Sequence, residues 1–285
     1  MSPTTIEADE PRKILLIAAG RQRVGKTTFL NTTAQFLRAH GAEFILWNAD
    51  KMNRTYSLSN FHPDVLEPSS ADAEDGKAWL EGRFTDMVVN KYNALLDIGG
   101  GETPLNRLVE EVAIVRTLER RGHRILLAHV VGPEMADLDY LERFLAGGLF
   151  APQATLIVLN QGLVLNGRSA SFAFGAVRQH PALMEAMKKG AKMVMMPSLA
   201  CMSQVTDRGL TFADAMNGVS KPGTQPLSFF DQERVATWWE NELPPFYGMI
   251  PRLWLPAMPG FEPPILKQAD QAQPVSGKKR SGTDG

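Results

Sequence analysis

Cysteine is almost absent from this sequence of 285 residues, and that scarcity excludes two kinds of site. A single cysteine, Cys201, can form neither an internal disulfide framework nor a metal site built from several thiolates. Such cysteine usage is typical of proteins from a reducing compartment. We therefore expect a cytoplasmic protein.

Long apolar runs and an excess of charge are missing as well. No run of about 18 apolar residues occurs, so the sequence predicts no span across a membrane. The sequence has 30 basic and 31 acidic residues, which leaves a formal net charge of −1. No overall field therefore indicates nucleic acid or an anionic membrane as a partner, and either would need a local basic patch.

Signatures of several enzyme classes are also lacking. The five histidines are scattered, and none has a carboxylate or cysteine at ligand spacing, which argues against zinc. No Ser-His-Asp or G-x-S-x-G pattern indicates a nucleophilic hydrolase. The opening MSPTTIEADEPRK is polar and acidic, so we expect a disordered lead rather than a signal peptide.

Six short apolar runs rich in β-branched residues predict buried strands. They lie at 13–19, 43–49, 92–98, 124–131, 154–160 and 192–197. Continuous apolar runs are typical of parallel strands that are covered on both faces. Helical patterns separate the runs, and one of them predicts a single helix from Pro104 to a stop at Gly122. The sequence therefore predicts an α/β fold, a doubly wound, mostly parallel sheet flanked by helices.

A phosphate-binding motif follows the first predicted strand. The segment GRQRVGKTT, which starts at Gly20, fits the pattern G-x-x-x-x-G-K-T. A strand precedes it and a helical pattern follows it, which is the context that this motif requires. The pattern predicts that the chain binds a nucleotide.

Each residue of the motif has an expected contact with the nucleotide. Backbone N–H groups between Val24 and Thr28 would point at the β-phosphate, assisted by the positive end of the helix. Gly25 lets the backbone approach, and Lys26 reaches the β- and γ-phosphate oxygens. The Thr27 hydroxyl would be a ligand for Mg²⁺.

Polar residues at the ends of later strands complete the predicted site. Asp97 ends an apolar run before three glycines, as a Walker B aspartate does, and would hold Mg²⁺ directly or through water. Asn160 ends the fifth run, where its amide can pair with the edge of an adenine ring. Asp50 follows the second run and either orients water or serves only as a turn or helix-cap residue.

The stretch from Gly20 to Thr55 resembles the opening of the ParA/MinD family of P-loop ATPases, within the CobQ/CobB/MinD/ParA group of nucleotide-binding proteins. The loop is a variant of that family's deviant Walker A pattern, K-G-G-x-G-K-T-T. Arg21 stands at the signature lysine, and Gln22 and Arg23 replace two glycines. The resemblance implies ATP and Mg²⁺ as cofactors. It also implies an ATP-dependent homodimer, in which Arg21 reaches the phosphates of the other subunit.

The same resemblance assigns other residues. Asp50 falls on the acidic position that orients the attacking water, whereas Asn48 replaces the acidic residue before it. The stretch 195–215 resembles a late segment of the family and would place Pro197 beside the base, near Asn160. Solvated loop cations remain an alternative for the two loop arginines.

The resemblance and the composition divide the chain into four expected parts. They are a lead at 1–11, a P-loop ATPase domain at 12–242, a proline-rich extension at 243–265 and a disordered tail at 266–285. The extension has too many prolines for a helix or a central strand. It is either an extended segment that lies over the domain and buries its apolar side chains or a docking strip for a protein partner.

These patterns favour an Mg²⁺-dependent ATPase, slow in turnover, that drives a cycle of dimers or switch loops. Catalysis would depend on Lys26, Asp50 and Arg21. Plasmid partition, conjugative transfer or another positioning role fits the resemblance. The resemblance also implies that surface lysines could bind DNA. Two alternatives stay open: a nucleotide-binding scaffold with little or no turnover, and a small-molecule kinase on the same fold.

Overall fold

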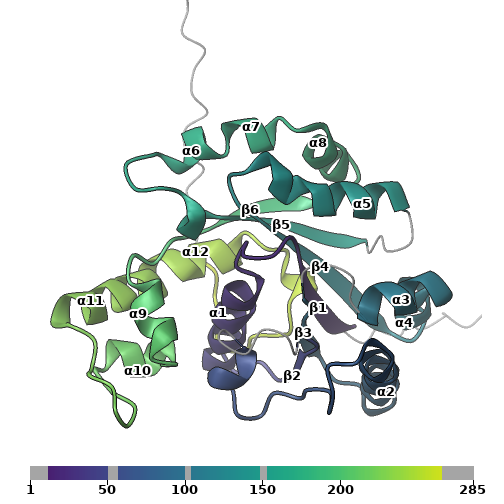
Figure 1. Cartoon of the computed structure of the whole chain (residues 1–285), viewed down its shortest axis with the longest axis horizontal. Coiled ribbons are helices and arrows are strands. Elements are labelled where there is room, and N and C mark those ends of the chain that lie inside the picture. Colours follow the sequence, from purple (N-terminus) through teal and green to yellow (C-terminus); the bar gives the residue numbers. More distant parts are fainter. Residues whose placement is uncertain (1–11, 51–56, 100–103, 148–152, 265–285) are drawn as a thin grey trace, which may run out of the picture.

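Six parallel strands form one sheet in the order β2-β3-β1-β4-β5-β6 (Figure 1). The computed structural model describes residues 12–50, 57–99, 104–147 and 153–264, so the predicted lead and tail lie outside the described residues. All six predicted strands are confirmed. Their bounds are β1 Lys13–Ala19, β2 Ile45–Asn48, β3 Ala94–Asp97, β4 His123–Val131, β5 Ala154–Asn160 and β6 Lys192–Met196.

The strand order places β1 between β3 and β4. β1 pairs with β3 from Leu15 to Ala18, and with β4 from Lys13 to Ala19. The chain builds one side of the sheet with β2 and β3 and then crosses to the other side with β4. The carboxyl ends of β1, β3 and β4 therefore flank the switch point at which open α/β sheets bind ligands.

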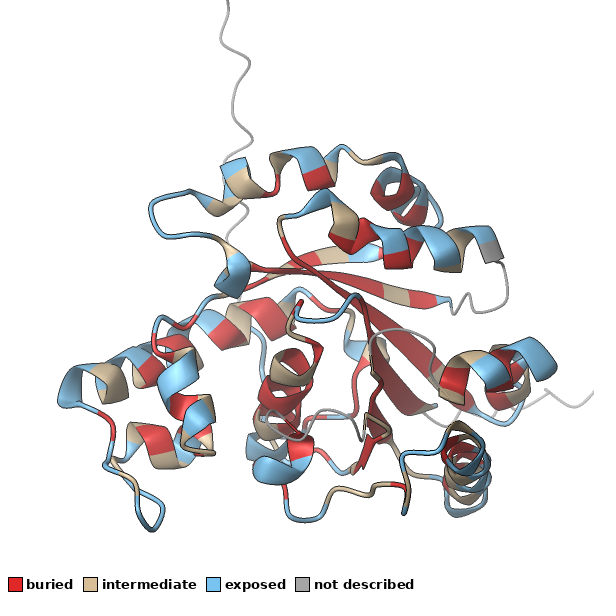
Figure 2. Ribbon diagram, viewed as in Figure 1, coloured by how far each residue is buried: buried red, intermediate tan, exposed pale blue. Residues whose placement is uncertain are grey.

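Helices cover both faces of the sheet, and the strands are buried almost throughout (Figure 2). Leu16 and Ala18 of β1 lie in the same apolar cluster as Phe29 of α1. Leu15 and Ile17 point to the opposite face and join a second cluster with α2, α3 and α4. The continuous apolar runs in the sequence thus correspond to strands that are covered on both sides.

The helices have the following bounds in chain order: α1 Lys26–Ala39, α2 Ala73–Asn90, α3 Pro104–Glu111, α4 Ile114–Glu119, α5 Asp139–Gly147, α6 Ala170–Ala173, α7 Gly175–Arg178, α8 Pro181–Lys188, α9 Met202–Asp207, α10 Phe212–Met216, α11 Phe229–Thr237 and α12 Leu243–Gly248. A π-helical turn at Trp238–Glu242 joins α11 to α12. No helix in the described part of the chain is long and apolar enough to cross a bilayer.

One predicted helix is split in two. The pattern from Pro104 to Gly122 predicted a continuous helix, but α3 ends at Glu111 and α4 begins at Ile114. An unbroken helix would keep Val112 on the buried face and bring Arg116 onto it one turn later. The break leaves Val112 exposed and lets Ile114 and Leu118 enter the core, while Arg116 stays in solvent.

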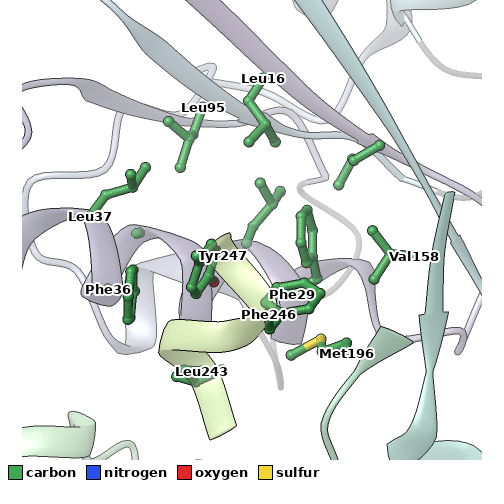
Figure 3. Close-up of a cluster of buried hydrophobic side chains, with 14 of the residues drawn as sticks. Leu16, Phe29, Phe36, Leu37, Leu95, Val158, Met196, Leu243, Phe246 and Tyr247 are labelled. Atoms are coloured by element: carbon green, nitrogen blue, oxygen red, sulfur yellow. The ribbon is translucent and has the colours of Figure 1, made fainter. Parts of the chain in front are cut away.

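The proline-rich extension also differs from its prediction, because part of it is helical. α12 has prolines at its first positions, where the missing N–H groups have no intrahelical acceptor in any case. Its Phe246 and Tyr247 are buried in the same cluster as α1 (Figure 3). The Tyr247 ring stacks on Phe36 with centroids 4.0 Å apart, and its hydroxyl bonds Thr33 Oγ1 at 3.0 Å.

Candidate functional site

The loop between β1 and α1 depends on two glycines with positive φ. Gly20 has a φ of 141°, and a Cβ there would lie 2.5 Å from the carbonyl oxygen of Val130. Gly25 has a φ of 93°, and a Cβ there would lie 2.5 Å from Asn160 Nδ2. Both glycines of the motif are therefore required by the chain's own packing as well as by any phosphate.

Arg23 occupies the left-handed region with a φ of 66°, which is uncommon for a residue with a side chain. In the resembling family a glycine stands at this position. The backbone here keeps a conformation that glycine adopts freely, and a non-glycine residue costs about 1 kcal/mol to hold there. The loop tolerates the substitution because the Arg23 side chain is exposed.

The first turn of α1 is suited to an anion. No side chain in the described ranges caps this helix, and the first helical bond runs from Phe29 N–H to Gly25 O. The N–H groups of the preceding residues have no intrahelical acceptor, and they carry the positive end of the helix dipole. Lys26, Thr27 and Thr28 line a cavity of about 1000 Å³ at this point.

Lys26 lies at the base of this cavity and is 7% exposed. Its ammonium donates a hydrogen bond to the carbonyl oxygen of Arg21 at 3.1 Å. Burial lowers the pKa of Lys26, while the nearby Asp97 and Asp50 carboxylates act in the opposite direction. A poorly solvated cation next to the uncapped N–H groups of α1 is well placed to bind an anionic ligand, and a divalent cation would offset the charge of the two carboxylates.

Asp97 is the last residue of β3 and is 2% exposed. Its Oδ2 accepts a hydrogen bond from Thr27 Oγ1 at 2.7 Å, whereas its Oδ1 is buried and bonds no group in the described chain. Burial raises the pKa of Asp97 to about 6, although the Thr27 hydroxyl and Lys26 favour the charged form.

These two side chains fit a magnesium ion. A carboxylate oxygen without a partner next to a hydroxyl offers the hard oxygen ligands that Mg²⁺ takes. Nowhere in the described ranges do three or more His, Cys, Asp or Glu side chains form a metal-binding group. Thr27 and Asp97 would therefore share the ion with phosphate oxygens and water, as is usual for Mg²⁺.

Asp50 lies at the carboxyl end of β2 and is held through its backbone. Its N–H donates to Asn48 Oδ1 at 3.0 Å, and its carboxylate lies close to Gly99, where a Cβ would be 3.3 Å from Oδ1. The Asn48 amide donates to Glu67 at 2.7 Å and to Ser57 at 2.9 Å. Asn48 thus organises the exit of β2. Glu67 was not predicted, because it lies outside the stretches 20–55 and 195–215 that carry the resemblance.

Asn160 and Pro197 both line the cavity. Asn160 Nδ2 donates to Val24 O at 2.9 Å, and its Oδ1 accepts from the N–H of Gly162 at 3.0 Å. The carbonyl oxygen of Pro197 accepts from Trp238 Nε1 at 3.1 Å. Asn160 therefore supports the phosphate loop from the end of β5, a role that its predicted contact with adenine did not include.

Arg21 is directed away from the other predicted site residues. Its guanidinium lies 3.3 Å from Glu134 and 3.6 Å from Asp137, in the turn after β4, and it does not line the cavity. Of the other predicted site residues, Gly25 to Thr28, Asp50, Asn160 and Pro197 line the cavity, whereas Gly20, Val24 and Asp97 do not. The turn after β4 contains no motif, so the contact of Arg21 with Asp137 could not be predicted from local patterns.

Comparisons with known proteins find similarity only at the level of solved structures. No family model and no curated protein matches the sequence. The MinC:MinD cell division protein complex of Aquifex aeolicus is 15% identical, with 71% of this chain and 88% of that chain covered at a TM-score of 0.44. The MinD cell division protein of Aquifex aeolicus is 14% identical, covering 79% and 95% at 0.41.

The signal recognition particle receptor FtsY of Elizabethkingia anophelis is 15% identical, with 81% of this chain and 66% of that chain covered at a TM-score of 0.41. Likeness at this level does not bear on activity. Membership of the ParA/MinD family stays a prediction, and the functional argument depends on the geometry of the site itself.

Proposed function

We propose that this chain binds ATP with Mg²⁺ and hydrolyses it slowly. The observation that carries the proposal is the pair of Thr27 and Asp97. The two side chains meet at 2.7 Å at the start of α1, and one buried oxygen of the Asp97 carboxylate has no hydrogen-bond partner among the described residues. The residues come from a phosphate-loop motif and from the end of a neighbouring strand, which is the arrangement that Mg²⁺-nucleotide sites use.

Each residue of the proposed site has its own chemical role. The first-turn N–H groups of α1 would bind phosphate oxygens, and Lys26 would leave the Arg21 carbonyl to bind the β- and γ-phosphates. A bound magnesium ion would neutralise charge on the phosphates. Asp50, at the edge of the cavity, would accept a hydrogen bond from water and orient it toward the terminal phosphate.

A cycle of dimers or switch loops would give this turnover a biological use. Support for such a cycle comes from the resemblance at the phosphate loop, from Gly20 to Thr28. The role that we propose is plasmid partition, conjugative transfer or cellular positioning. We propose that the protein acts in the cytoplasm. We also propose two possible partners: DNA, or a protein that binds the C-terminal extension.

Two observations favour the alternative of a scaffold with little turnover. Arg23 keeps a strained backbone where the resembling family has glycine, and Asn48 replaces an acidic residue. Both changes leave the phosphate-binding groups intact but alter their surroundings. A small-molecule kinase stays a further alternative, since the cavity of about 1000 Å³ lies at the upper end of the size range of ligand pockets and offers room for a second substrate.

Calorimetry with ATP and GTP, with and without Mg²⁺, tests the proposal on the full chain. Lys26→Ala should weaken ATP binding by roughly 2–4 kcal/mol because it removes a charge-assisted contact. Lys188→Ala, which removes an exposed lysine of α8, is the matched control and should bind like the wild type. No heat with either nucleotide on folded protein would overturn the proposal.

Turnover assays then separate the candidates. Phosphate release that depends on Asp50 supports the ATPase, and tight binding without turnover supports the scaffold. Phosphate transfer to an added acceptor supports the kinase. Sedimentation with and without ATP tests the dimer, and an unchanged monomer would remove it.

A further inference from the structure

The first half of the phosphate loop is held against the turn that follows β4. Gly20 packs so closely on Val130 that no side chain fits between them, because a Cβ would lie 2.5 Å from the Val130 carbonyl oxygen. One residue later, Arg21 reaches the same part of the molecule and pairs with Asp137 and Glu134. Gly20 and Arg21, which are consecutive in the loop, are thus both held against the end of β4 and the turn that follows it.

Asp137 is an unusual partner for a surface arginine because its own side chain is only 7% exposed. Burial raises its pKa, whereas backbone N–H groups of Glu134 and Gly132 and the Arg21 guanidinium favour its charged form. Gly132 makes room for the carboxylate, since a Cβ there would lie 2.5 Å from Asp137 Oδ2. The turn is therefore shaped around a buried carboxylate that faces Arg21.

The Arg21 backbone connects this ion pair to the site. Its carbonyl oxygen accepts the hydrogen bond from Lys26 Nζ at 3.1 Å, while its guanidinium is held at the turn after β4. Holding the Arg21 side chain therefore restrains the part of the loop whose carbonyl bonds Lys26 before a phosphate takes its place. Asn160 supports the far half of the loop through Val24, from the end of β5.

We propose that Arg21 is a positioning residue that acts within its own chain: with Asp137 it forms a brace that holds the phosphate loop in its anion-binding shape. Arg21 then contributes to affinity through loop order rather than by touching phosphate. The consequence for affinity rests on the proposed function, but the brace itself is a property of the nucleotide-free chain.

Glu134 provides an internal contrast. It lies nearer to Arg21 than Asp137 does, at 3.3 Å against 3.6 Å, but its side chain is 74% exposed. Exposed ion pairs contribute little because water screens them, whereas a buried carboxylate that loses its partner is left poorly solvated. Asp137, and not the closer Glu134, should therefore carry the effect.

Hydrogen exchange on nucleotide-free protein tests the brace directly. Arg21→Gln and Asp137→Asn should each speed exchange of the Phe29 amide, which is bonded to Gly25 O at the end of the loop, by about tenfold, because the braced conformation opens more often. The double variant should exchange no faster than either single variant, and Arg21→Lys should recover part of the protection. Glu134→Gln is the matched control and should exchange like the wild type.

Titration with ATP and Mg²⁺ measures the consequence in the same variants. Each single variant should bind about tenfold more weakly and the double variant no more weakly than that, since coupled partners are not additive. The loss should not depend on protein concentration. The thermal midpoint of Asp137→Asn without nucleotide should change little, because this variant leaves no buried charge without its partner, and this separates loop order from global stability.

The outcomes are distinguishable. If Arg21 touches phosphate, in its own chain or across a dimer, Arg21→Gln weakens binding while Asp137→Asn leaves both binding and exchange unchanged, and the brace is overturned. Equal exchange in all variants overturns it as well. If the wild type binds no nucleotide, the proposed function fails, and hydrogen exchange still decides whether the brace exists.

Discussion

Asp97 and Asp50 both lie at carboxyl ends of strands beside the phosphate loop, yet the structure holds them in opposite ways. The Asp97 carboxylate is buried, bonded to Thr27 and desolvated enough to raise its pKa to about 6. Asp50 is only half-buried, and it is the backbone N–H of Asp50 that is fixed, by Asn48. One carboxylate has a rigid position, while the other keeps access to the cavity.

This difference matches two kinds of chemical role. A metal ligand benefits from a fixed, poorly solvated position, because water then competes less well for the ion. A group that orients water must stay within reach of water, and its position is set by the backbone around it. We therefore propose that Asp97 binds the ion and that Asp50 orients the attacking water, and the following experiments test that division.

Asp50→Ala should give the largest effect. We expect turnover to fall by roughly 10²–10³-fold, the usual contribution of a positioned acid–base group, with ATP affinity nearly unchanged. Phosphate release and calorimetry measure the two quantities, and Asp139→Ala, an exposed aspartate of α5, is the control. An equal loss of affinity and turnover would show that Asp50 binds rather than activates.

Asn48→Asp should have the next largest effect, on stability. The new carboxylate would face Glu67, which now accepts from the Asn48 amide at 2.7 Å. Replacing that hydrogen bond by repulsion should cost about 1–3 kcal/mol of unfolding free energy, measured by urea denaturation. Adding Glu67→Gln should restore most of the loss. If the double variant is no more stable than Asn48→Asp, the pair does not organise the β2 exit.

The smallest expected effect is a pH dependence that separates the two aspartates. Because the pKa of Asp97 is raised to about 6, protons compete with Mg²⁺ for it as pH falls through that value. Between pH 7.5 and 5.5 the Mg²⁺-dependent gain in ATP affinity should fall by about fourfold. Asp97→Asn is the control, because any pH dependence that remains in this variant comes from the titration of ATP itself. If the Mg²⁺-dependent gain of the wild type changes with pH no more than that of Asp97→Asn, Asp97 is not the titrating metal ligand.

Local patterns in the sequence predicted the strands and the site residues that belong to motifs. The six apolar runs each became a strand, because burial on both faces requires an unbroken apolar run wherever a central strand lies. The contact of Thr27 with Asp97 joins residues that are 70 positions apart, but the glycines at 20 and 25 and Thr27 itself belong to one local motif. Their positions in three dimensions are consequences of strand, loop and helix in a fixed order.

Other features could not be read locally. The break after Glu111 depends on which side chains the rest of the core can accept, since the helical pattern continues through it. The helix at Leu243–Gly248 exists because the preceding π turn and α1 support a segment whose prolines fall only in its first turn. Composition alone predicted an extended chain there.

By itself, then, the sequence determined the strand pattern and the phosphate-loop motif, because both are written in residues that are neighbours along the chain. Only the tertiary structure decided that Glu67 would meet Asn48, that the turn after β4 would hold Arg21, and that Asn160 would support Val24. The last pair is 136 residues apart in the chain. Such contacts depend on how parallel strands bring their carboxyl ends to one edge, which no local pattern encodes.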